Sequence, residues 1–287
     1  MTIEIKDLSK NFGSTKALVN VSLSFEENSI YGLLGNNGAG KSTLFNIITN
    51  RLYPTSGTIL LDGKQVADND HALGNIFMQG DKNLYPEDMR VKKALEATAH
   101  FYPDFDMKYA LTLAEKFELP LKKKIQSLST GYASIFRLVL ALSVNTPYLL
   151  LDEPVLGLDA QHRDMFYKTL LQKYAENPCC VVISTHLIAE VAGIISQAVI
   201  LRQGQVIRNL PVEEMLASGY SVSGPAKLVD DYSIGRNIIS SQSLGGLKTV
   251  CLEGERDSAA PMGLEFDNLN LQDYFIQLMT GEGKNHE

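Results

Sequence analysis

The sequence predicts an α/β fold in which strands alternate with helices and pair into a parallel sheet. Apolar runs and helical stretches alternate over roughly the first 200 residues. Strand signals vanish between residues 81 and 141, where helical periodicity takes over, so we expect an inserted helical block there. The composition changes again at residues 211–218. We therefore divide the chain into a main domain, residues 1–218, and a small C-terminal α+β appendage, residues 219–287.

Each expected element has its own local signal. Period-two alternation, or an apolar run bounded by turn residues, predicts strands at residues 2–8, 18–25, 29–34, 57–63, 74–78, 148–153, 179–184, 198–203 and 206–208. Apolar residues at helical spacing predict helices at residues 43–50, 91–101, 107–117, 131–141 and 211–218. In the appendage we expect strands at residues 248–252 and 263–266. A final helix is expected to place four apolar side chains on one face: Leu271, Tyr274, Phe275 and Leu278.

The composition excludes several classes of protein. The chain has 287 residues, and 26 lysines and arginines against 33 aspartates and glutamates give a formal charge of −7. An acidic chain without a basic block is a poor nucleic-acid binder, so we expect no nucleic-acid partner. No apolar stretch approaches the ~20 residues that span a bilayer, and the charged, alternating start is not a secretory signal. The three cysteines predict neither a disulfide framework nor a metal site, and we expect a soluble, cytosolic protein.

A glycine-rich loop follows the strand expected at residues 29–34 and opens the next helix. It matches the pattern G-x-x-x-x-G-K-[ST] with Gly35, Asn36, Asn37, Gly38, Ala39, Gly40, Lys41 and Ser42, and Thr43 follows. Glycines let backbone N–H groups approach phosphate oxygens, and a helix N-terminus favours their negative charge. Lys41 meets the β- and γ-phosphate charge, and Ser42 offers a hydroxyl to Mg²⁺. The loop predicts a P-loop NTPase.

Two carboxylates end the apolar strand expected at residues 148–153. Asp152 and Glu153 stand before Pro154, at the sheet edge where α/β proteins bind ligands. On their own, such residues are usually surface carboxylates. Beside a phosphate loop, we expect Asp152 to hold the water shell of the metal and Glu153 to polarise the nucleophilic water.

Five further segments complete a family pattern in its usual order. They are Phe12 before Gly13, Gln79 after a strand, Leu128–Tyr132 (LSTGY), Gly157–Asp159 (GLD) and His186 in the tripeptide STH. Each alone has an ordinary explanation, as a strand-end aromatic, a satisfied polar group, a turn or a partly buried histidine. With these segments in this order, the chain over roughly residues 1–215 resembles the ATP-binding subunits of ABC transporters. The resemblance implies an ABC-type P-loop NTPase core with a RecA-like mixed sheet.

The resemblance also implies roles for individual residues. Catalytic roles are implied for Lys41, Gln79, Glu153 and His186, and metal contacts for Ser42, Gln79 and Asp152. Nucleotide contacts are implied for Phe12, Ala17, Gly35, Asn36, Asn37, Gly38, Ala39, Gly40, Lys41, Ser42, Thr43, Gln79, Ser129, Gly131, Asp159 and His186. In such subunits the aromatic stacks on adenine, the glutamine senses the membrane partner, and the histidine contacts the γ-phosphate.

The signature segment departs from the family pattern. The usual sequence is LSGGQ, whereas here Thr130 replaces the first glycine and Tyr132 replaces the glutamine. Ser129 and Gly131, which resemble the two residues that meet the γ-phosphate bound to the other subunit, are retained. A backbone N–H at a helix start keeps its attraction for anions. We therefore expect a working composite site with a weaker closed dimer.

The function implied by this resemblance is the ATP-hydrolysing motor of a membrane transporter. The cofactors are ATP and Mg²⁺, and the partners are a separate transmembrane permease and a second nucleotide-binding subunit, identical or a close paralogue. The location is the cytoplasmic side of a bacterial membrane, with a groove for the permease based at residues 79–85. The helical block, residues 211–218 and the final helix resemble ABC-2-type exporters. Residues 128–164 resemble the branch that exports bacitracin-type and phenol-soluble-modulin peptides, which implies a peptide or other amphipathic cargo.

Two other functions stay open beside the transporter motor. One is a soluble ABC-type ATPase that acts on ribosomes or DNA, which the single nucleotide domain and the acidic charge disfavour. The other is a regulatory ATP-binding subunit without turnover, which the presence of Glu153 and His186 disfavours. Protein kinases and small GTPases are excluded because their signatures are missing from the sequence.

Overall fold

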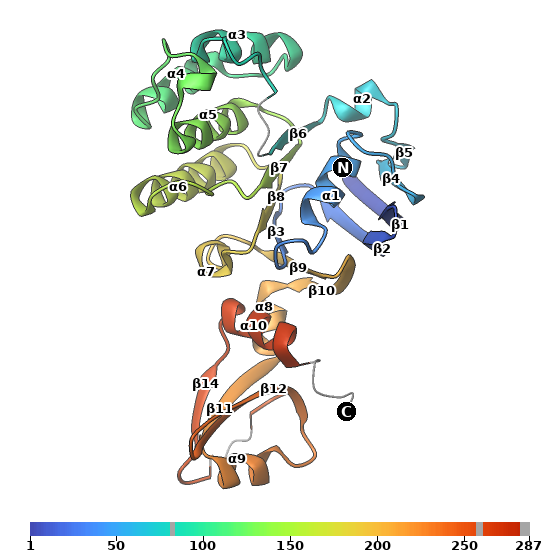
Figure 1. Cartoon of the computed structure of the whole chain (residues 1–287), viewed down its shortest axis with the longest axis vertical. Coiled ribbons are helices and arrows are strands. Elements are labelled where there is room, and N and C mark those ends of the chain that lie inside the picture. Colours follow the sequence, from blue (N-terminus) through green and yellow to red (C-terminus); the bar gives the residue numbers. More distant parts are fainter. Residues whose placement is uncertain (81–83, 257–260, 282–287) are drawn as a thin grey trace.

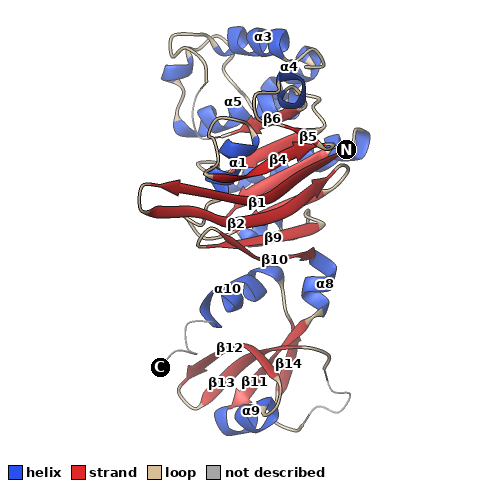
Figure 2. Ribbon diagram, turned by 90° about the vertical axis from the view of Figure 1, so that its right-hand side faces the viewer, coloured by secondary structure: helices blue, strands red, loops and turns tan. Residues whose placement is uncertain are grey.

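The described residues form three β-sheets, with helices on both faces of the central one (Figure 1). The computed structural model describes residues 1–80, 84–256 and 261–281. The helical block lies at one end of the molecule and the appendage at the other. The central sheet and the N-terminal sheet lie between them (Figures 1 and 2).

The central sheet has six strands in the order β10-β9-β3-β8-β7-β6. They are β3 (Ile30–Leu34), β6 (Ile76–Gln79), β7 (Tyr148–Asp152), β8 (Cys180–Thr185), β9 (Gln197–Arg202) and β10 (Gln205–Pro211). All neighbours pair in parallel except β9 and β10, so the predicted mixed sheet is confirmed. The edge strand is antiparallel because Gln203 and Gly204, both at positive φ, make a tight turn that reverses the chain.

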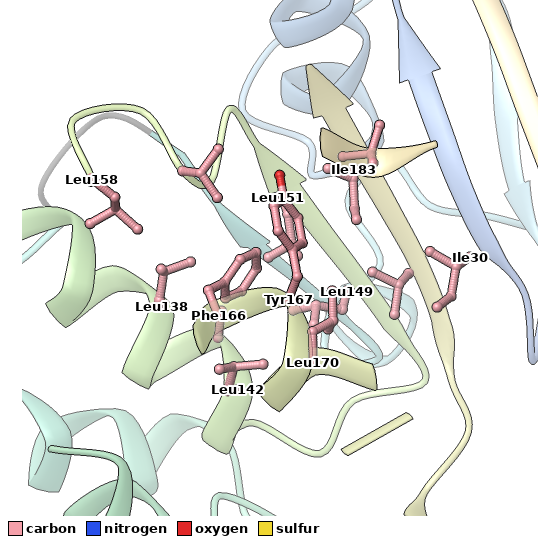
Figure 3. Packing of buried hydrophobic residues seen from close by; sticks show 14 of the residues in the cluster. Ile30, Leu138, Leu142, Leu149, Leu151, Leu158, Phe166, Tyr167, Leu170 and Ile183 are labelled. Atoms are coloured by element: carbon pink, nitrogen blue, oxygen red, sulfur yellow. The ribbon is translucent and has the colours of Figure 1, made fainter. Parts of the chain in front are cut away.

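The central sheet is buried on both faces. In β7, Tyr148 and Leu150 enter the core toward the N-terminal sheet, whereas Leu149 and Leu151 enter the core under the helices. Figure 3 shows the second of these cores, where Phe166 of α6 (Ala160–Glu176) lies among leucines from α5 (Thr130–Ser143) and the sheet. This two-sided burial explains why the strands are continuous apolar runs in the sequence.

The N-terminal sheet is antiparallel, in the order β2-β1-β4-β5. Its strands are β1 (Thr2–Phe12), β2 (Thr15–Glu26), β4 (Ser56–Leu61) and β5 (Lys64–Gln65). Helix α1 (Lys41–Ile48) contributes Leu44 and Phe45 to the core between this sheet and the central one. The helix expected at residues 43–50 thus begins two residues earlier, because the left-handed Gly40 (φ 109°) ends the loop there. A short helix, α2 (Asp70–Leu73), precedes β6.

The helical block follows β6 and contains α3 (Val91–Phe101), α4 (Met107–Lys116), the 3₁₀ turn η1 (Ile125–Ser127) and α5. Helices α4 and α5 begin at side-chain caps, since Asp106 accepts from Tyr109 N at 2.8 Å and Ser129 from Tyr132 N at 3.3 Å. Helix α6 and the four-residue α7 (Ile188–Val191) complete this layer. Residues 81–83, where the expected block begins, lie outside the described residues.

The appendage is an antiparallel sheet with one helix on each side. The strands, in the order β12-β13-β11-β14, are β11 (Gly219–Pro225), β12 (Asn237–Leu244), β13 (Leu247–Glu253) and β14 (Glu265–Asn268). Helix α9 (Ala226–Ser233) covers one face, and α10 (Leu271–Gly281) lies between β12 and the main domain (Figure 1). The expected face of α10 is confirmed, since its four apolar side chains are buried.

The remaining expectations for the appendage need correction. The strand expected at residues 263–266 begins two residues later, and Pro211 ends β10 and precedes α8 (Val212–Ala217) instead of lying in its first turn. Strands β11 and β12 and helix α9 were not expected. The sequences of these strands, GYSVSGP and NIISSQSL, are rich in small and polar residues, and both strands pair with β13.

Lys173 on α6 is a buried cation that fixes the end of α5. Its Nζ donates to the carbonyl oxygens of Leu142 and Val144, at 2.5 and 2.8 Å, and to Asn145 Oδ1 at 3.0 Å. The carbonyls at a helix C-terminus lack intrahelical donors, so this side chain satisfies them. Burial lowers the pKa of Lys173 to about 8. The segment that it holds leads directly into β7, which carries Asp152.

We expect Lys173→Met to lower the free energy of unfolding by about 1–3 kcal/mol, because it leaves buried acceptors without a donor. Lys168→Met on the same helix is the control, since the Lys168 side chain is 74% exposed and its ion pair with Asp164 lies at the surface. Urea unfolding followed by circular dichroism measures both. Equal losses in the two variants would show that the buried hydrogen bonds contribute nothing.

Candidate functional site

The glycine-rich loop wraps the start of α1 against β2 and β9. A Cβ on Gly40 would lie 2.6 Å from the carbonyl oxygen of Ala17, and one on Gly35 would lie 2.6 Å from that of Leu201. Gly40 also has a φ of 109°, so both the space and the backbone require glycine there. The first N–H groups of α1 have no intrahelical acceptors and are therefore free to bind an anion.

Lys41 is nearly buried and turns back over the loop that precedes it. Its Nζ donates to the carbonyl oxygens of Gly35 at 2.7 Å and Asn36 at 3.2 Å. The same atom lies 3.5 Å from Glu153 Oε1, and the Lys41 side chain is only 6% exposed. These three oxygens satisfy the buried ammonium group, which would otherwise be costly to remove from water.

Glu153 is the centre of a network that joins three segments. Besides Lys41, its Oε1 contacts His186 Nδ1 at 2.9 Å, and its Oε2 accepts from the Thr185 hydroxyl at 3.2 Å. Its backbone is left-handed, with a φ of 45°, yet its N–H still donates to Ser184 O at 2.9 Å. Such a backbone is uncommon in a residue other than glycine and turns the carboxylate away from the line of β7.

Asp152, one residue earlier, contacts serine hydroxyls and not the Lys41 ammonium that Glu153 contacts. Its Oδ1 accepts from the Ser184 hydroxyl at 2.7 Å, and the Ser42 hydroxyl also hydrogen-bonds its carboxylate. Burial raises the pKa of Asp152, and the two hydroxyl hydrogen bonds oppose that rise. A hydroxyl and a carboxylate side by side form half of an oxygen site that suits Mg²⁺.

Gln79, at the end of β6, supplies a further oxygen at this sheet edge. It is 5% exposed, and its Oε1 is a buried acceptor without a hydrogen-bond partner among the described residues. Its Cα pairs with that of Leu151, so it stands beside the strand that ends in Asp152. The donor set of Ser42, Asp152 and Gln79 fits a hard divalent cation that keeps part of its water shell.

The LSTGY and GLD segments contact each other rather than the loop at the start of α1. A Cβ on Gly131 would lie 3.4 Å from the Gly157 carbonyl oxygen, and the Ser134 hydroxyl donates to Leu156 O at 2.8 Å. Asp159 caps α6 by accepting from His162 N at 2.9 Å. Ser129 caps the start of α5 next to these contacts.

Phe12 ends β1 as an exposed aromatic side chain. It is 47% exposed, and the Lys10 ammonium lies 5.1 Å from its ring centroid. Ala17 lies on the adjoining strand and reaches the loop through its backbone oxygen. An aromatic ring exposed in this way is available for stacking.

Sequence reasoning missed two contributions to this site. Thr185 binds Glu153 and also accepts from Leu187 N at 2.9 Å, which links the carboxylate to the segment after His186. The position of Thr185 directly before His186, in the tripeptide STH, could have indicated this contribution. The side chains of α10 that lie near His186 had no signal, because nothing in a sequence indicates which surface an amphipathic helix covers.

Comparison with known proteins decides the family. Residues 18–156 match the family described as ABC transporter. The chain is 30% identical over 213 residues to the ABC transporter ATP-binding protein YtrB of Bacillus subtilis, covering 74% of this chain and 73% of YtrB. The chain belongs to the ATP-binding proteins of ABC transporters. This ABC ATPase therefore binds ATP and hydrolyses it to ADP and phosphate.

Other relatives differ in how much of the ABC ATPase they match. The uncharacterized ABC transporter ATP-binding protein YcbN of Bacillus subtilis is 26% identical over 302 residues, covering 97% of both chains. The ribose import ATP-binding protein RbsA 2 of Agrobacterium fabrum is 28% identical, and the match covers 86% of this chain but 53% of that protein. The similarity to YcbN thus extends over the appendage.

Solved structures share the fold of the main domain. The dimeric structure of MJ0796, a bacterial ABC transporter cassette, is 25% identical with a TM-score of 0.65, covering 73% of this chain and 98% of that one. An ATP-binding subunit of an ABC transporter reaches a TM-score of 0.68 at 24% identity. The predicted ABC-type P-loop NTPase fold is confirmed. In the described residues, no helix has the length and apolar character needed to cross a bilayer.

We expect Glu153→Gln to lower Mg-ATP turnover by about 100-fold or more, since an amide no longer attracts a proton from water. Binding of ATP should persist, because the loop and Lys41 are unchanged. Steady-state phosphate release and a fluorescent ATP analogue measure the two properties. Glu115→Gln, on the exposed surface of α4, is the control and should leave both unchanged; turnover retained in Glu153→Gln would exclude the assigned role.

Proposed function

We propose that the ABC ATPase drives a transporter by hydrolysing ATP at the site centred on Glu153. The observation that carries this proposal is that Lys41 and His186 both contact Glu153. Its Oε1 lies 3.5 Å from Lys41 Nζ and 2.9 Å from His186 Nδ1. The carboxylate accepts a proton from the attacking water, His186 orients the carboxylate and meets the γ-phosphate, and Lys41 balances phosphate charge. Ser42, Gln79 and Asp152 would hold a Mg²⁺ ion, which would supply positive charge against the phosphates.

The remaining residues at the site are proposed to hold the nucleotide. The backbone of residues 35–43 surrounds the phosphates, and Phe12 stacks on the base, with Ala17 behind the loop. Ser129 and Gly131 meet the phosphate bound to a second copy or paralogue, and Asp159 closes the same interface. Two subunits then enclose two nucleotides, so ATP favours the closed pair by binding across it. The dimer of MJ0796 supports this arrangement.

The partner surface is proposed to be the groove between the central sheet and the helical block. This cavity, of about 550 Å³, is lined by Gln79, Gly80, Tyr85, Phe101 and Tyr102 together with Arg51 and Arg137. Its mixture of aromatic and basic side chains suits a short amphipathic helix of a membrane permease. Gln79 lies both in this groove and at the metal site, so partner binding and hydrolysis share a residue. Residues 81–83 of the expected base lie outside the described residues.

We further propose that the transporter is an exporter of peptides or other amphipathic compounds, at the cytoplasmic face of a bacterial membrane. Support comes from the compact helical block and from α8 and α10 after the main domain. The relatives that import ribose match this chain over only about half of their own length. We place the boundary of the nucleotide-binding domain at residue 218, with residues 219–287 as an accessory domain.

A Glu153→Gln subunit should form an ATP-dependent dimer, because ATP that is bound but not hydrolysed holds the composite interface closed. Light scattering on size-exclusion chromatography measures the mass with Mg-ATP and with Mg-ADP. Adding Gly131→Arg, which blocks the start of α5, should return the protein to a monomer. A monomer at saturating ATP would contradict the two-subunit site.

Filling the groove should release the permease. In Ala97→Trp, a bulky side chain replaces a groove-lining methyl group on α3. Co-purification with the permease from detergent-solubilised membranes should fall by ~10-fold or more, equivalent to about 1.4 kcal/mol. Lys93→Trp, at a 71% exposed position on the same helix, is the matched control. Unchanged thermal midpoints in both variants establish that each is folded, and equal recovery of permease would exclude the groove.

A further inference from the structure

The C-terminal helix α10 lies against the segment that carries His186. A cavity of about 310 Å³ is lined on one side by Asn36 of the phosphate loop and by residues 186–190. On its other side it is lined by Gln272, Phe275 and Ile276 of α10. A helix from the appendage therefore forms a wall beside the ATPase site.

α10 is held by the main domain as well as by its own sheet. Its buried side chains, Leu271, Tyr274, Phe275 and Leu278, belong to the same hydrophobic core as Ile188 and Val191 of α7. Arg202 Nη1 also donates to the Leu278 carbonyl oxygen at 3.4 Å. Arg202 follows Leu201, whose carbonyl oxygen packs against Gly35 of the phosphate loop. Helix α10 therefore contacts one residue next to the packing partner of that loop, and it also packs with α7, which follows His186.

The segment after His186 depends on contacts with other helices for its position. Helix α7 has four residues, too few to be stable in isolation. On one side Glu190 pairs with Arg163 of α6 at 2.5 Å. On the other side, the buried Ile188 and Val191 lie in the core that α10 completes. The placement of His186 against Glu153 therefore depends on what packs behind this short helix.

We propose that Phe275 is a positioning residue for His186 and that α10 thereby links the appendage to the rate of ATP hydrolysis. This inference rests on the role proposed above for His186. Phe275 is 5% exposed and lines the cavity that His186 also lines, so its ring fixes the distance between α10 and the segment of residues 186–190. Loss of the ring allows that segment to move, and small displacements of a reacting group lower kcat strongly.

Phe275→Ala should lower kcat roughly ten-fold while KM for ATP stays within about two-fold, because the phosphate loop is untouched. Phe275→Leu, which keeps most of the volume, should restore most of the rate. Phe266→Ala is the matched control, since Phe266 lies in the same appendage but packs on Tyr220 and Tyr232 beneath α9. Equal loss in the two alanine variants, or wild-type kcat in Phe275→Ala, overturns the inference.

His186→Ala separates this inference from the proposed function. If His186→Ala itself turns over at the wild-type rate, the role proposed for His186 fails. If His186→Ala is slow and Phe275→Ala is not, only the inference about α10 fails. When both are slow, the double variant should be no slower than His186→Ala, because Phe275 acts through that histidine; a further loss overturns the inference.

A fluorescent reporter tests the contact without catalysis. The chain has no tryptophan, so Ile276→Trp, at a 46% exposed position beside His186, gives a single emitter. Saturating Mg-ATP should shift its emission, whereas Leu244→Trp, at an 84% exposed position in the distal hairpin, should not respond. ATP binding measured by calorimetry with no change at Ile276→Trp overturns the coupling.

Discussion

The parallel pairing of β3, β8 and β7 is the constraint on which the site depends. The register sets Leu33 beside Ser184, and Ser184 beside Asp152, so the three strands end level. Neighbouring strands lie about 4.8 Å apart, and the segments that follow them therefore bring both Lys41 and His186 into contact with Glu153. Gln79 joins the same edge from β6. Burial of the sheet on both faces keeps these ends from shifting independently.

A second constraint is the sharing of charge at Glu153. The carboxylate neutralises the nearly buried Lys41 and holds His186, and each of these partners is also a group that meets phosphate in the proposed reaction. A phosphate that approaches Lys41 competes with Glu153 for the same ammonium. Nucleotide binding would thus weaken the contact between Glu153 and Lys41. The carboxylate would then be free to act as a base toward water. The left-handed backbone at Glu153 makes this reach possible by turning the side chain out of the strand.

Much of this main domain can be predicted from the sequence because its signals are local. The glycines at 35 and 40 are required by backbone approaches that a Cβ would block, and the apolar runs of the strands follow from burial on both faces. The appendage was less predictable. Strands β11 and β12 are rich in glycine, serine and other small or polar residues, which weakens their local strand signal, and their pairing with β13 stabilises them.

The partner of α10 illustrates what sequence patterns omit and why it matters. Helical spacing identifies the face made by Leu271, Tyr274, Phe275 and Leu278, but the surface that buries this face includes α7, about 80 residues earlier in the chain. Each such side chain contributes about 1.5–3 kcal/mol when buried, so α10 does not leave the core at low cost. A helix anchored this firmly moves together with the surface that it covers. Displacement of the appendage is therefore passed on to the segment after His186 and is not absorbed by a flexible joint.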